Sequence, residues 1–374
     1  MAASSSAPRI SCTASASELR RGRDVESCWL RVERLETKTA LSPVALNNKL
    51  STFIATMRLL LTSLLLVSAF AQAVTPGGKH KLVLIAGKPS HPPGMHEFKA
   101  GTMLLEKCLS SLPNLVVDRH EMGWVKDEAT FADADAVVIY ADGGKGHPAV
   151  QGAHLETLRA LIIKGVGFGV MHYGVEVVPE LGGAEFKEWL GGHYENAFSC
   201  NPIWEPNFLS FPKHPITSGV KPFQIQDEWY INMRFRPAFK DGIVAAEDAG
   251  MKFVPILVAT PPDATRGGPY VAPKGPYPHI QAEKGAQEST MWAVERADGG
   301  RGFGFTGGHF HKNWGNNDFR KTILNALLWI SKLDVPADGV SSVVSDDDLT
   351  QNLDIKPASK PKKTAMLTPG VFQR

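Results

Sequence analysis

The chain has 374 residues, a formal net charge of +2 at pH 7, and 43% hydrophobic residues. This composition is that of a globular protein with one large domain or two ordinary ones. A charge so close to zero, with no long basic run before the C-terminal tail, argues against a nucleic-acid partner.

An export signal is predicted near the start of the sequence. Met57 begins the stretch MRLLLTSLLLVSAFAQA, in which a positive charge precedes a short apolar run and the small-x-small site Ala71–Ala73. This order is typical of a secretory signal peptide, and the apolar run is too short to span a bilayer. We therefore predict that residues 57–73 are removed and that the mature protein begins near Val74. It would be exported, periplasmic or secreted, with no membrane span after cleavage.

The segment before Met57 has a different character. Residues 1–56 are rich in Ser, Ala and Arg and have few aromatic side chains, which is typical of disordered sequence. Acidic residues such as Glu18 and Asp24 are not expected in a transit peptide. Our hypothesis is that translation begins at Met57 and that residues 1–56 are a spurious or disordered extension.

Strands alternate with helical patterns in the next part of the chain. The predicted strands are Lys81–Ala86, Leu115–Asp118, Ala136–Tyr140 and Val166–Met171. Amphipathic helices are predicted around 98–112 and 155–163. This alternation predicts a parallel sheet with helices on both faces. Four polar residues follow strand ends directly, namely His91, His96, Asp142 and His172. Ligands of such sheets bind at the carboxyl ends of the strands, so we expect these four to share one rim.

After Glu176 the pattern changes. The stretches FLSFP, DEWYINMRF and FVPILVATPP predict strands without clear intervening helices. A hairpin is predicted with its turn at Ala297–Gly300, and a last helix over 317–333 carries one apolar stripe. We interpret 74–335 as one domain with β-rich insertions, and 336–374 as a loosely held polar tail.

Two cysteines, Cys108 and Cys200, follow the predicted signal. Two cysteines make neither a disulfide framework nor a zinc ribbon. Cys108 lies in a helical pattern, so we expect a packed core thiol there.

Histidines in loops rich in Gly and Pro are the main chemical signal. The sequence has twelve histidines, and loops on a rigid scaffold are where sites are built. His96, His172, Glu228 and either His309 or His311 offer the ligand types of a zinc site. No H-E-x-x-H or C-x-x-C motif is present. Without a metal, His172 beside a carboxylate could act as a general acid or base.

Carboxylates and aromatic rings accompany these loops. Asp227 and Glu228 would point to opposite faces of a strand, one toward the site and one toward solvent. The nearby aromatic residues are Tyr173, Tyr194, Trp204, Trp229 and Trp314. Such rings can pack against the C–H face of a sugar. Alternatively they are core residues, and this second interpretation is strongest for Trp229.

Several stretches resemble the ThuA-like (trehalose-utilisation) family, whose fold is similar to that of class I glutamine amidotransferases. They are AGKPSHPPGMHEFKAG, GFGVMHYGVE, WLGGHYE, HPITSGVKPFQIQDEWY and RGFGFTGGHFHKNWGNNDFRKTILNALLWI. The resemblance implies an α/β, flavodoxin-like or class I glutamine amidotransferase-like parallel sheet with flanking helices and extra β-rich insertions.

The resemblance also implies that the nucleophilic cysteine of the amidotransferases is missing. The amidotransferase elbow carries a nucleophilic Cys followed two residues later by Gly, and here His172 and Gly174 take those positions. His309 falls where that fold places its catalytic histidine region. An imidazole at the elbow forms no thioester, so glutamine hydrolysis is excluded.

For function, the resemblance implies carbohydrate catabolism, with glycosides or 3-oxo-glycosides as substrates and a sugar dehydrogenase as a pathway partner. The candidate catalytic residues are His172, Glu228 and His309. The candidate substrate-binding residues are His91, His96, Tyr173, Asp227, Tyr230, His311 and Trp314. The candidate ligands of a divalent metal such as zinc are His96, His172, Glu228 and His309.

Three interpretations stay open at this point. The first is an exported lyase, hydrolase or isomerase that acts on sugars through histidine and carboxylate acid–base chemistry. The second is a non-catalytic sugar- or partner-binding protein on an amidotransferase-like scaffold. The third is a structural metal site. Clustered histidines favour the first, since a pure sugar binder has little need of groups that titrate near neutrality.

Overall fold

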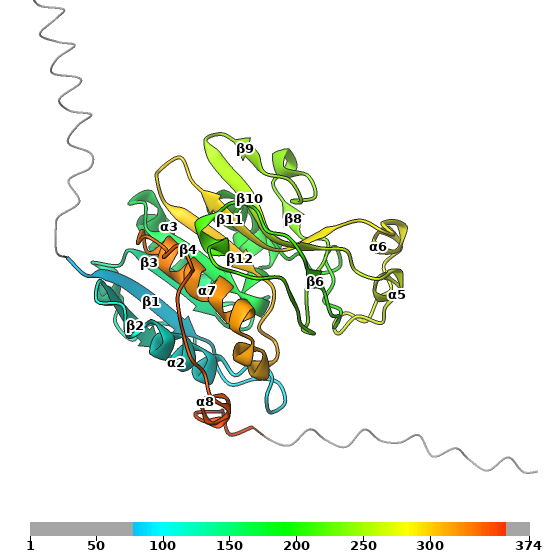
Figure 1. Cartoon of the computed structure of the whole chain (residues 1–374). Coiled ribbons are helices and arrows are strands. Elements are labelled where there is room, and N and C mark those ends of the chain that lie inside the picture. Colours follow the sequence, from blue (N-terminus) through cyan, green and yellow to red (C-terminus); the bar gives the residue numbers. More distant parts are fainter. Residues whose placement is uncertain (1–77, 357–374) are drawn as a thin grey trace, which may run out of the picture. The chain divides into compact units, whose positions relative to one another are not determined.

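The computed structural model describes residues 78–356 (Figure 1). The predicted signal at 57–73, the segment 1–56 and residues 357–374 lie outside it. No helix among the described residues is long and apolar enough to cross a membrane.

An eight-stranded sheet in the order β2-β1-β3-β4-β12-β11-β10-β9 forms the centre of the structure. Its strands are β1 His80–Ala86, β2 Leu115–His120, β3 Ala136–Tyr140, β4 Gly167–Met171, β9 Ala246–Asp248, β10 Met251–Ala259, β11 Glu288–Glu295 and β12 Arg301–Phe305. The first four strands and β12 pair in parallel, whereas β11, β10 and β9 continue the sheet antiparallel. The predicted parallel sheet and the predicted hairpin are both confirmed.

Helices cover both faces of this sheet (Figure 1). The pairs α2 Phe98–Leu109 with α7 Asn317–Ile330, and α3 His154–Ile163 with α4 Ala184–Leu190, pack on opposite faces. The short helices α5 Asp263–Arg266, α6 Pro278–Ala282 and α8 Asp346–Thr350 lie away from the sheet (Figure 1). Alternate residues of β1 divide between two hydrophobic cores. Leu82 and Leu84 pack with α2 and α7, while Val83 and Ile85 pack with α3 and α4. A strand buried on both faces explains the continuous apolar run in the sequence.

The segment between α4 and β9 is mostly irregular. Its strands are β5 Gly192–His193, β6 Asn207–Phe208, β7 Phe223–Gln224 and β8 Arg234–Phe235, which form two small sheets. The predicted strand DEWYINMRF is therefore wrong over most of its length. Isolated bridges, Trp204 to Asp227 and Cys200 to Ile231, hold this stretch instead.

The expected loosely held tail is also wrong up to Lys356. Val340 is 2% exposed, and its backbone N–H donates to Asn325 Oδ1 at 2.8 Å. The short helix α8 follows, and the side chain of Lys356 is buried. Polar composition misled the prediction, because a few buried contacts are enough to fix a polar segment.

Cys108 and Cys200 are both buried free thiols. This placement confirms the packed core thiol predicted at Cys108.

Candidate metal centre

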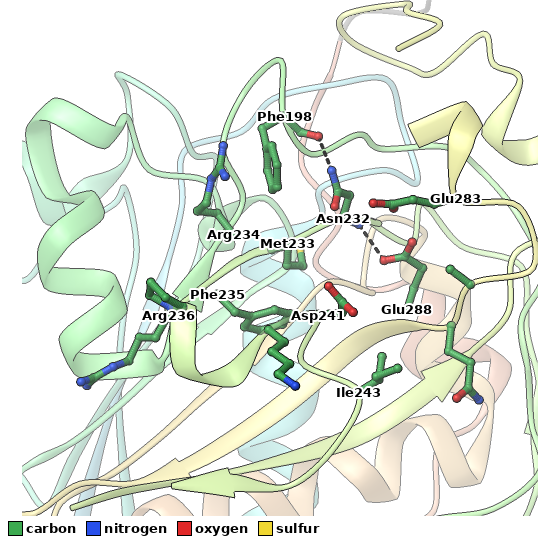
Figure 2. A pocket seen from close by; sticks show the side chains of 14 residues that line it. Phe198, Asn232, Met233, Arg234, Phe235, Arg236, Asp241, Ile243, Glu283 and Glu288 are labelled. Carbon is green, nitrogen blue, oxygen red and sulfur yellow. Dashed lines mark hydrogen bonds between the residues drawn. The ribbon is translucent and has the colours of Figure 1, made fainter. Parts of the chain in front are cut away.

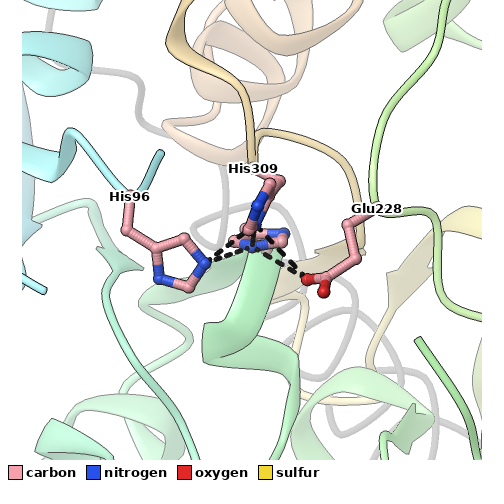
Figure 3. Close-up of side chains that lie close together, drawn as sticks. His96, Glu228 and His309 are labelled. Carbon is pink, nitrogen blue, oxygen red and sulfur yellow. Dashed lines mark hydrogen bonds and ion pairs between the residues drawn. The ribbon is translucent and has the colours of Figure 1, made fainter. Parts of the chain in front are cut away.

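Four buried side chains meet at the carboxyl edge of the sheet (Figure 3). His96 lies in the loop after β1, His172 directly follows β4, His309 follows β12, and Glu228 lies in the irregular segment. Each offers one ligand atom, and these atoms all lie within 4.8 Å of one another. The structure thus brings together the four residues that the sequence nominated as metal ligands.

The distances within this cluster are those of ligands around one ion. His96 Nε2 lies 3.0 Å from His172 Nε2 and 3.0 Å from His309 Nδ1. His309 Nδ1 lies 3.2 Å from His172 Nε2. Glu228 Oε2 lies 3.4 Å from His309 Nδ1 and 3.6 Å from His172 Nε2. Tetrahedral zinc, with bonds of about 2.0–2.1 Å, places its ligand atoms about 3.3–3.4 Å apart.

Strained backbone turns aim the histidines at this point. His96 has φ of 48° and His172 has φ of 52°, and neighbouring His91 has φ of 59°. Non-glycine residues in this left-handed region cost about 1–3 kcal/mol each and cluster at functional sites. At His172, β4 ends and a 3-10 turn over His172–Val175 begins. The elbow predicted from the sequence is therefore present, with an imidazole at its apex.

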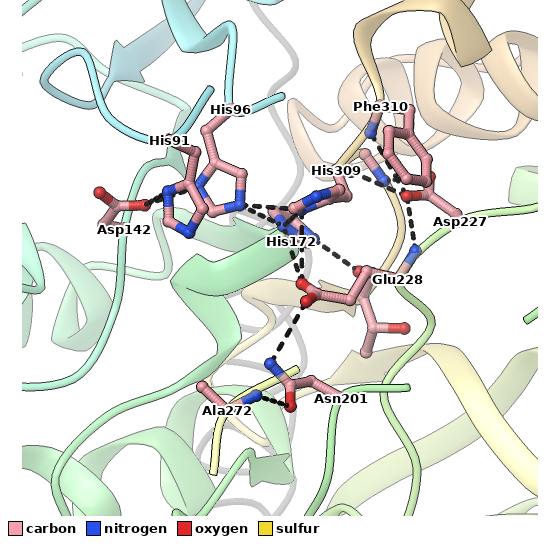
Figure 4. Close-up of polar contacts among 12 residues, drawn as sticks. His91, His96, Asp142, His172, Asn201, Asp227, Glu228, Ala272, His309 and Phe310 are labelled. Carbon is pink, nitrogen blue, oxygen red and sulfur yellow. Dashed lines mark hydrogen bonds and ion pairs between the residues drawn. The ribbon is translucent and has the colours of Figure 1, made fainter. Parts of the chain in front are cut away.

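Outer hydrogen bonds fix the tautomers of two ligands (Figure 4). His96 Nδ1 donates to the carboxylate of Asp142 at 2.7 Å, and His172 Nδ1 donates to the carbonyl oxygen of Thr306 at 3.0 Å. Asn201 Nδ2 donates to Glu228 Oε1 at 3.3 Å. Metal-bound histidines almost always donate their other ring N–H to such an acceptor.

These tautomers leave lone pairs facing one another. Since Nδ1 carries the proton in both His96 and His172, their Nε2 atoms are both unprotonated at a separation of 3.0 Å. Among three neutral imidazoles, only His309 could bring a proton into the centre. A cation bound between the three nitrogens would satisfy all of them at once.

Burial also keeps these groups uncharged. Desolvation lowers the pKa of His96 and of His172 well below the usual value, and lowers that of His309 to about 4. Desolvation, followed by the charge of Asp227, raises the pKa of Glu228. Three neutral imidazoles, together with Glu228 once it releases its proton and binds as a carboxylate, make a suitable donor set for a divalent transition metal.

Asp227 holds the loop that carries His309. Its carboxylate accepts hydrogen bonds from the backbone N–H groups of Gly308 and His309 at 2.8 and 3.0 Å, and from Asn313 Nδ2 at 3.0 Å. Asp227 is fully buried, so the expectation that one of the 227–228 pair faces solvent is wrong. With its oxygens occupied, Asp227 has a structural role, in place of the predicted contact with substrate.

His91 and the half-buried residues Tyr173 and Glu176 lie near the cluster. The ring of His91 stacks on that of His96 at a centroid distance of 3.5 Å, and its Nδ1 lies 3.9 Å from Asp142. Desolvation raises the pKa of Glu176 to about 7; desolvation, followed by the charge of Glu176, also raises the pKa of Tyr173. His91, His96, Asp142 and His172 therefore share one rim, as the topology predicted.

Three further nominated residues are buried. Trp314 is 0% exposed and packs edge-on against Tyr140 and Phe319, so it is a core residue and the prediction of a substrate contact is wrong. Tyr230 is 2% exposed, with its ring centroid 5.3 Å from that of His172. His311 is 2% exposed and does not belong to the cluster of four; its ring nitrogens have no hydrogen-bond partner among residues 78–356.

Sequence reasoning missed the partners of the ligands. The sequence predicts Asp142 on the rim because it closely follows a strand, but no local pattern predicts its hydrogen bond to His96. Asn201 and Glu176 carried no signal, since their neighbours in space come from distant parts of the chain.

A crevice of about 500 Å³ lies beside the cluster and is lined by Asp142, whose carboxylate accepts the hydrogen bond from His96 Nδ1. It is lined by residues that follow β1, β2 and β3, among them Gly87, Trp124 and Asp142. The indole of Trp124 stacks on the ring of His154 at a centroid distance of 3.9 Å. The strand order reverses between β1 and β3, and open α/β sheets bind ligands at such a point.

Another cavity, of about 300 Å³, lies in the irregular segment and contains none of the nominated residues (Figure 2). Asn232 spans its wall, where its backbone N–H donates to Glu288 at 2.7 Å and its amide donates to the carbonyl of Phe198 at 2.8 Å. The backbone N–H and the side-chain amide of Asn232 thus have their partners within the protein, and this wall offers no sign of a ligand.

A family model for ThuA, described as trehalose utilisation, matches residues 83–330. A crystal structure of a protein described as ThuA-like from Bacteroides uniformis ATCC 8492 is 12% identical, with a TM-score of 0.48 over 71% of this chain and 96% of that chain. A second, from Parabacteroides merdae ATCC 43184, is 15% identical, with a TM-score of 0.47 over 72% and 94%. No curated protein matches the chain.

Proposed function

The chain belongs to the ThuA family, described as trehalose utilisation, and on this premise we propose that it is a metal-dependent enzyme of carbohydrate catabolism. Its substrates are glycosides or 3-oxo-glycosides. One observation carries the proposal: the unprotonated Nε2 atoms of His96 and His172 face each other at 3.0 Å, with His309 and Glu228 completing the set. A non-catalytic sugar-binding protein has little need of such a group.

The donor set fits zinc or a related divalent ion. When bound, the ion would polarise a carbonyl or hydroxyl oxygen of the substrate. Holding an ion and moving a proton exclude each other, because both need the same lone pair. His172, His309 and Glu228 therefore act as ligands in this proposal, which replaces the acid–base roles first assigned to them.

Glu176 is the group best suited to move a proton. Burial brings its pKa to about 7, which is the range that suits a general base. In a 3-oxo-glycoside, the C2 hydrogen is acidified by the neighbouring carbonyl. Glu176 takes this proton, the electron pair left at C2 forms a double bond to C1, and the C1–O bond breaks. The departing oxygen then takes the proton from Glu176, leaves as an alcohol, and returns Glu176 to its carboxylate form.

The crevice beside Asp142 suits the part of the substrate that leaves. It opens at the same edge of the sheet as the cluster, and its wall contains the indole of Trp124. Aromatic planes pack against the C–H face of a sugar ring. A disaccharide-sized glycoside would place its reacting ring at the cluster and its second ring in the crevice.

The substrate class implies a partner and a location. A 3-oxo-glycoside forms by oxidation of a secondary alcohol, so a sugar dehydrogenase must supply it. Export to the periplasm or the outside of the cell, predicted from residues 57–73, would place the protein where external glycosides are met.

The test is a paired assay on chelator-treated protein before and after zinc is restored. Methyl 3-oxo-glucoside and methyl glucoside would be incubated separately and followed by NMR. The proposal expects zinc-dependent release of methanol, faster from the oxidised compound. Zinc binding without turnover of either compound would favour the non-catalytic or structural alternatives instead.

A further inference from the structure

The C-terminal strap, residues 336–356, lies outside the region that matches the family model and yet reaches the candidate metal centre. The family match ends at residue 330, where α7 ends. The strap crosses beside α7, forms α8, and ends at Lys356 close to the loop that follows β1 (Figure 1). The strap therefore lies outside the matched region, beside the edge of the sheet that carries the candidate metal centre.

The end of the strap forms a buried ion pair beside a ligand of the cluster. Lys356 Nζ lies 3.1 Å from Glu97 Oε1, and the two side chains are 2% and 1% exposed. The other oxygen of Glu97 accepts the backbone N–H of Asp354 at 2.8 Å. Glu97 Oε1 also accepts the N–H of Gly94 at 2.8 Å. Glu97 is the residue directly after His96.

The ammonium group of Lys356 also holds the ligand loop through its backbone. Nζ donates to the carbonyl oxygens of Met95 and His96, at 2.5 and 3.2 Å. That loop in turn pairs with the loop of His309, because His96 N–H donates to the carbonyl of His309 at 3.0 Å and His311 N–H donates to that of Gly94 at 2.9 Å. One side chain of the strap thus connects to two of the ligand loops.

We propose that Lys356 is a positioning residue that holds His96 in its ligand geometry, so that the strap completes the metal centre. This inference rests on the proposed function insofar as it needs the cluster to bind a metal. His96 has φ of 48°, a conformation that surrounding contacts must maintain, and Lys356 bonds the carbonyl of that very residue. The positive charge does not assist a cation directly, because Glu97 neutralises it.

The experiment compares four proteins by zinc affinity, measured by competition with a chromophoric chelator. They are the wild type, Lys356→Met, Lys356→Arg and Lys107→Met. Lys107 is the matched control, because it pairs with Asp348 on the same strap through an exposed side chain. We expect a loss of about 10- to 100-fold in zinc affinity for Lys356→Met, the usual effect of removing an outer partner of a ligand. Lys356→Arg should regain part of this loss, and Lys107→Met should match the wild type.

Two further measurements separate positioning from general stability. The visible spectrum of the cobalt-substituted protein should change in Lys356→Met, because it reports the geometry of the ligands. The double variant Glu97→Gln with Lys356→Met removes both charges, and it too should bind zinc more weakly than the wild type. Equal zinc affinity in the wild type and Lys356→Met, with a lower melting temperature of the metal-free variant, would overturn the inference and leave the metal centre intact. Absence of zinc binding in the wild type would instead overturn the proposed function.

Discussion

The two halves of the molecule contribute equally to the candidate metal centre but by different means. The parallel half, β2-β1-β3-β4, supplies His96 and His172 from turns directly after strands. The remaining half supplies His309 after β12, and Glu228 from an irregular stretch that isolated bridges, side-chain hydrogen bonds and the buried ring of Trp229 hold in place. In the first half the order of the parallel strands brings the two ligands to one edge, and hydrogen bonds then orient them. In the second half the buried carboxylate of Asp227 holds the loop that carries His309.

The strongest test of this joint construction removes one ligand from each half. His172→Ala and Glu228→Ala should each lower zinc affinity by more than about 100-fold, beyond the effect of losing an outer partner, and abolish turnover. Equilibrium dialysis against buffered zinc would measure the affinity. If Glu228→Ala kept the affinity of the wild type, the centre would belong to the histidines alone.

Loss of Asp227 should weaken the second half selectively. Asp227→Ala leaves the buried N–H groups of Gly308 and His309 and the amide of Asn313 without their acceptor. We expect the free energy of unfolding to fall by roughly 4 kcal/mol, since each such group costs about 1–3 kcal/mol and some will find water. Urea denaturation of the metal-free protein measures this effect, and a loss below about 1 kcal/mol would show that the loop is held by other contacts.

His147 gives the parallel half its own dependence on pH. Its Nε2 donates to the carbonyl of Gly174 and its Nδ1 accepts from Ala149 N–H, so the ring is neutral, and burial lowers its pKa to about 4. An unfolded histidine takes up a proton near pH 6.5. Stability from this group is therefore full above pH 6.5 and is lost as pH falls toward 4, by about 3 kcal/mol in total.

Unfolding curves of the wild type and His147→Gln, measured between pH 7 and pH 4, would isolate this contribution. The variant should lose less stability over that interval than the wild type. Parallel curves for the two proteins would show that the pKa of His147 is not lowered in the folded state.

The smallest expected effect concerns the crevice. Trp124→Leu should raise KM for an oxidised disaccharide by roughly tenfold, with kcat and zinc affinity unchanged, because a fixed aromatic wall contributes on the order of 1 kcal/mol. Methyl 3-oxo-glucoside, which lacks the second ring, serves as the control and should show no change. An equal rise for both substrates would place the indole at the reacting ring.

The difference between the two halves also explains which features could be predicted from the sequence. The four parallel strands, the hairpin and the last helix were predictable, because short-range apolar patterns determine them. His96 and His172 could be placed on one rim because strand ends of a parallel sheet share an edge. The contact of Glu228 with them depends on bridges between residues distant in sequence, which no local pattern encodes.

Other parts were mispredicted for physical reasons. Asp227 was expected to alternate with Glu228 on a strand, but both are buried on an irregular segment where alternation does not apply. The polar composition of the strap predicts a loosely held tail. Its ordering comes from single buried contacts, such as that of Lys356 with Glu97, and composition does not reveal these.

Crystallography of the zinc-loaded protein, with anomalous data collected at the zinc edge, tests the central claim most directly. The account predicts one ion per chain, bound at about 2.0–2.2 Å by His96 Nε2, His172 Nε2, His309 Nδ1 and Glu228 Oε2. An anomalous map without a peak between these four side chains, from protein saturated with zinc, would contradict it.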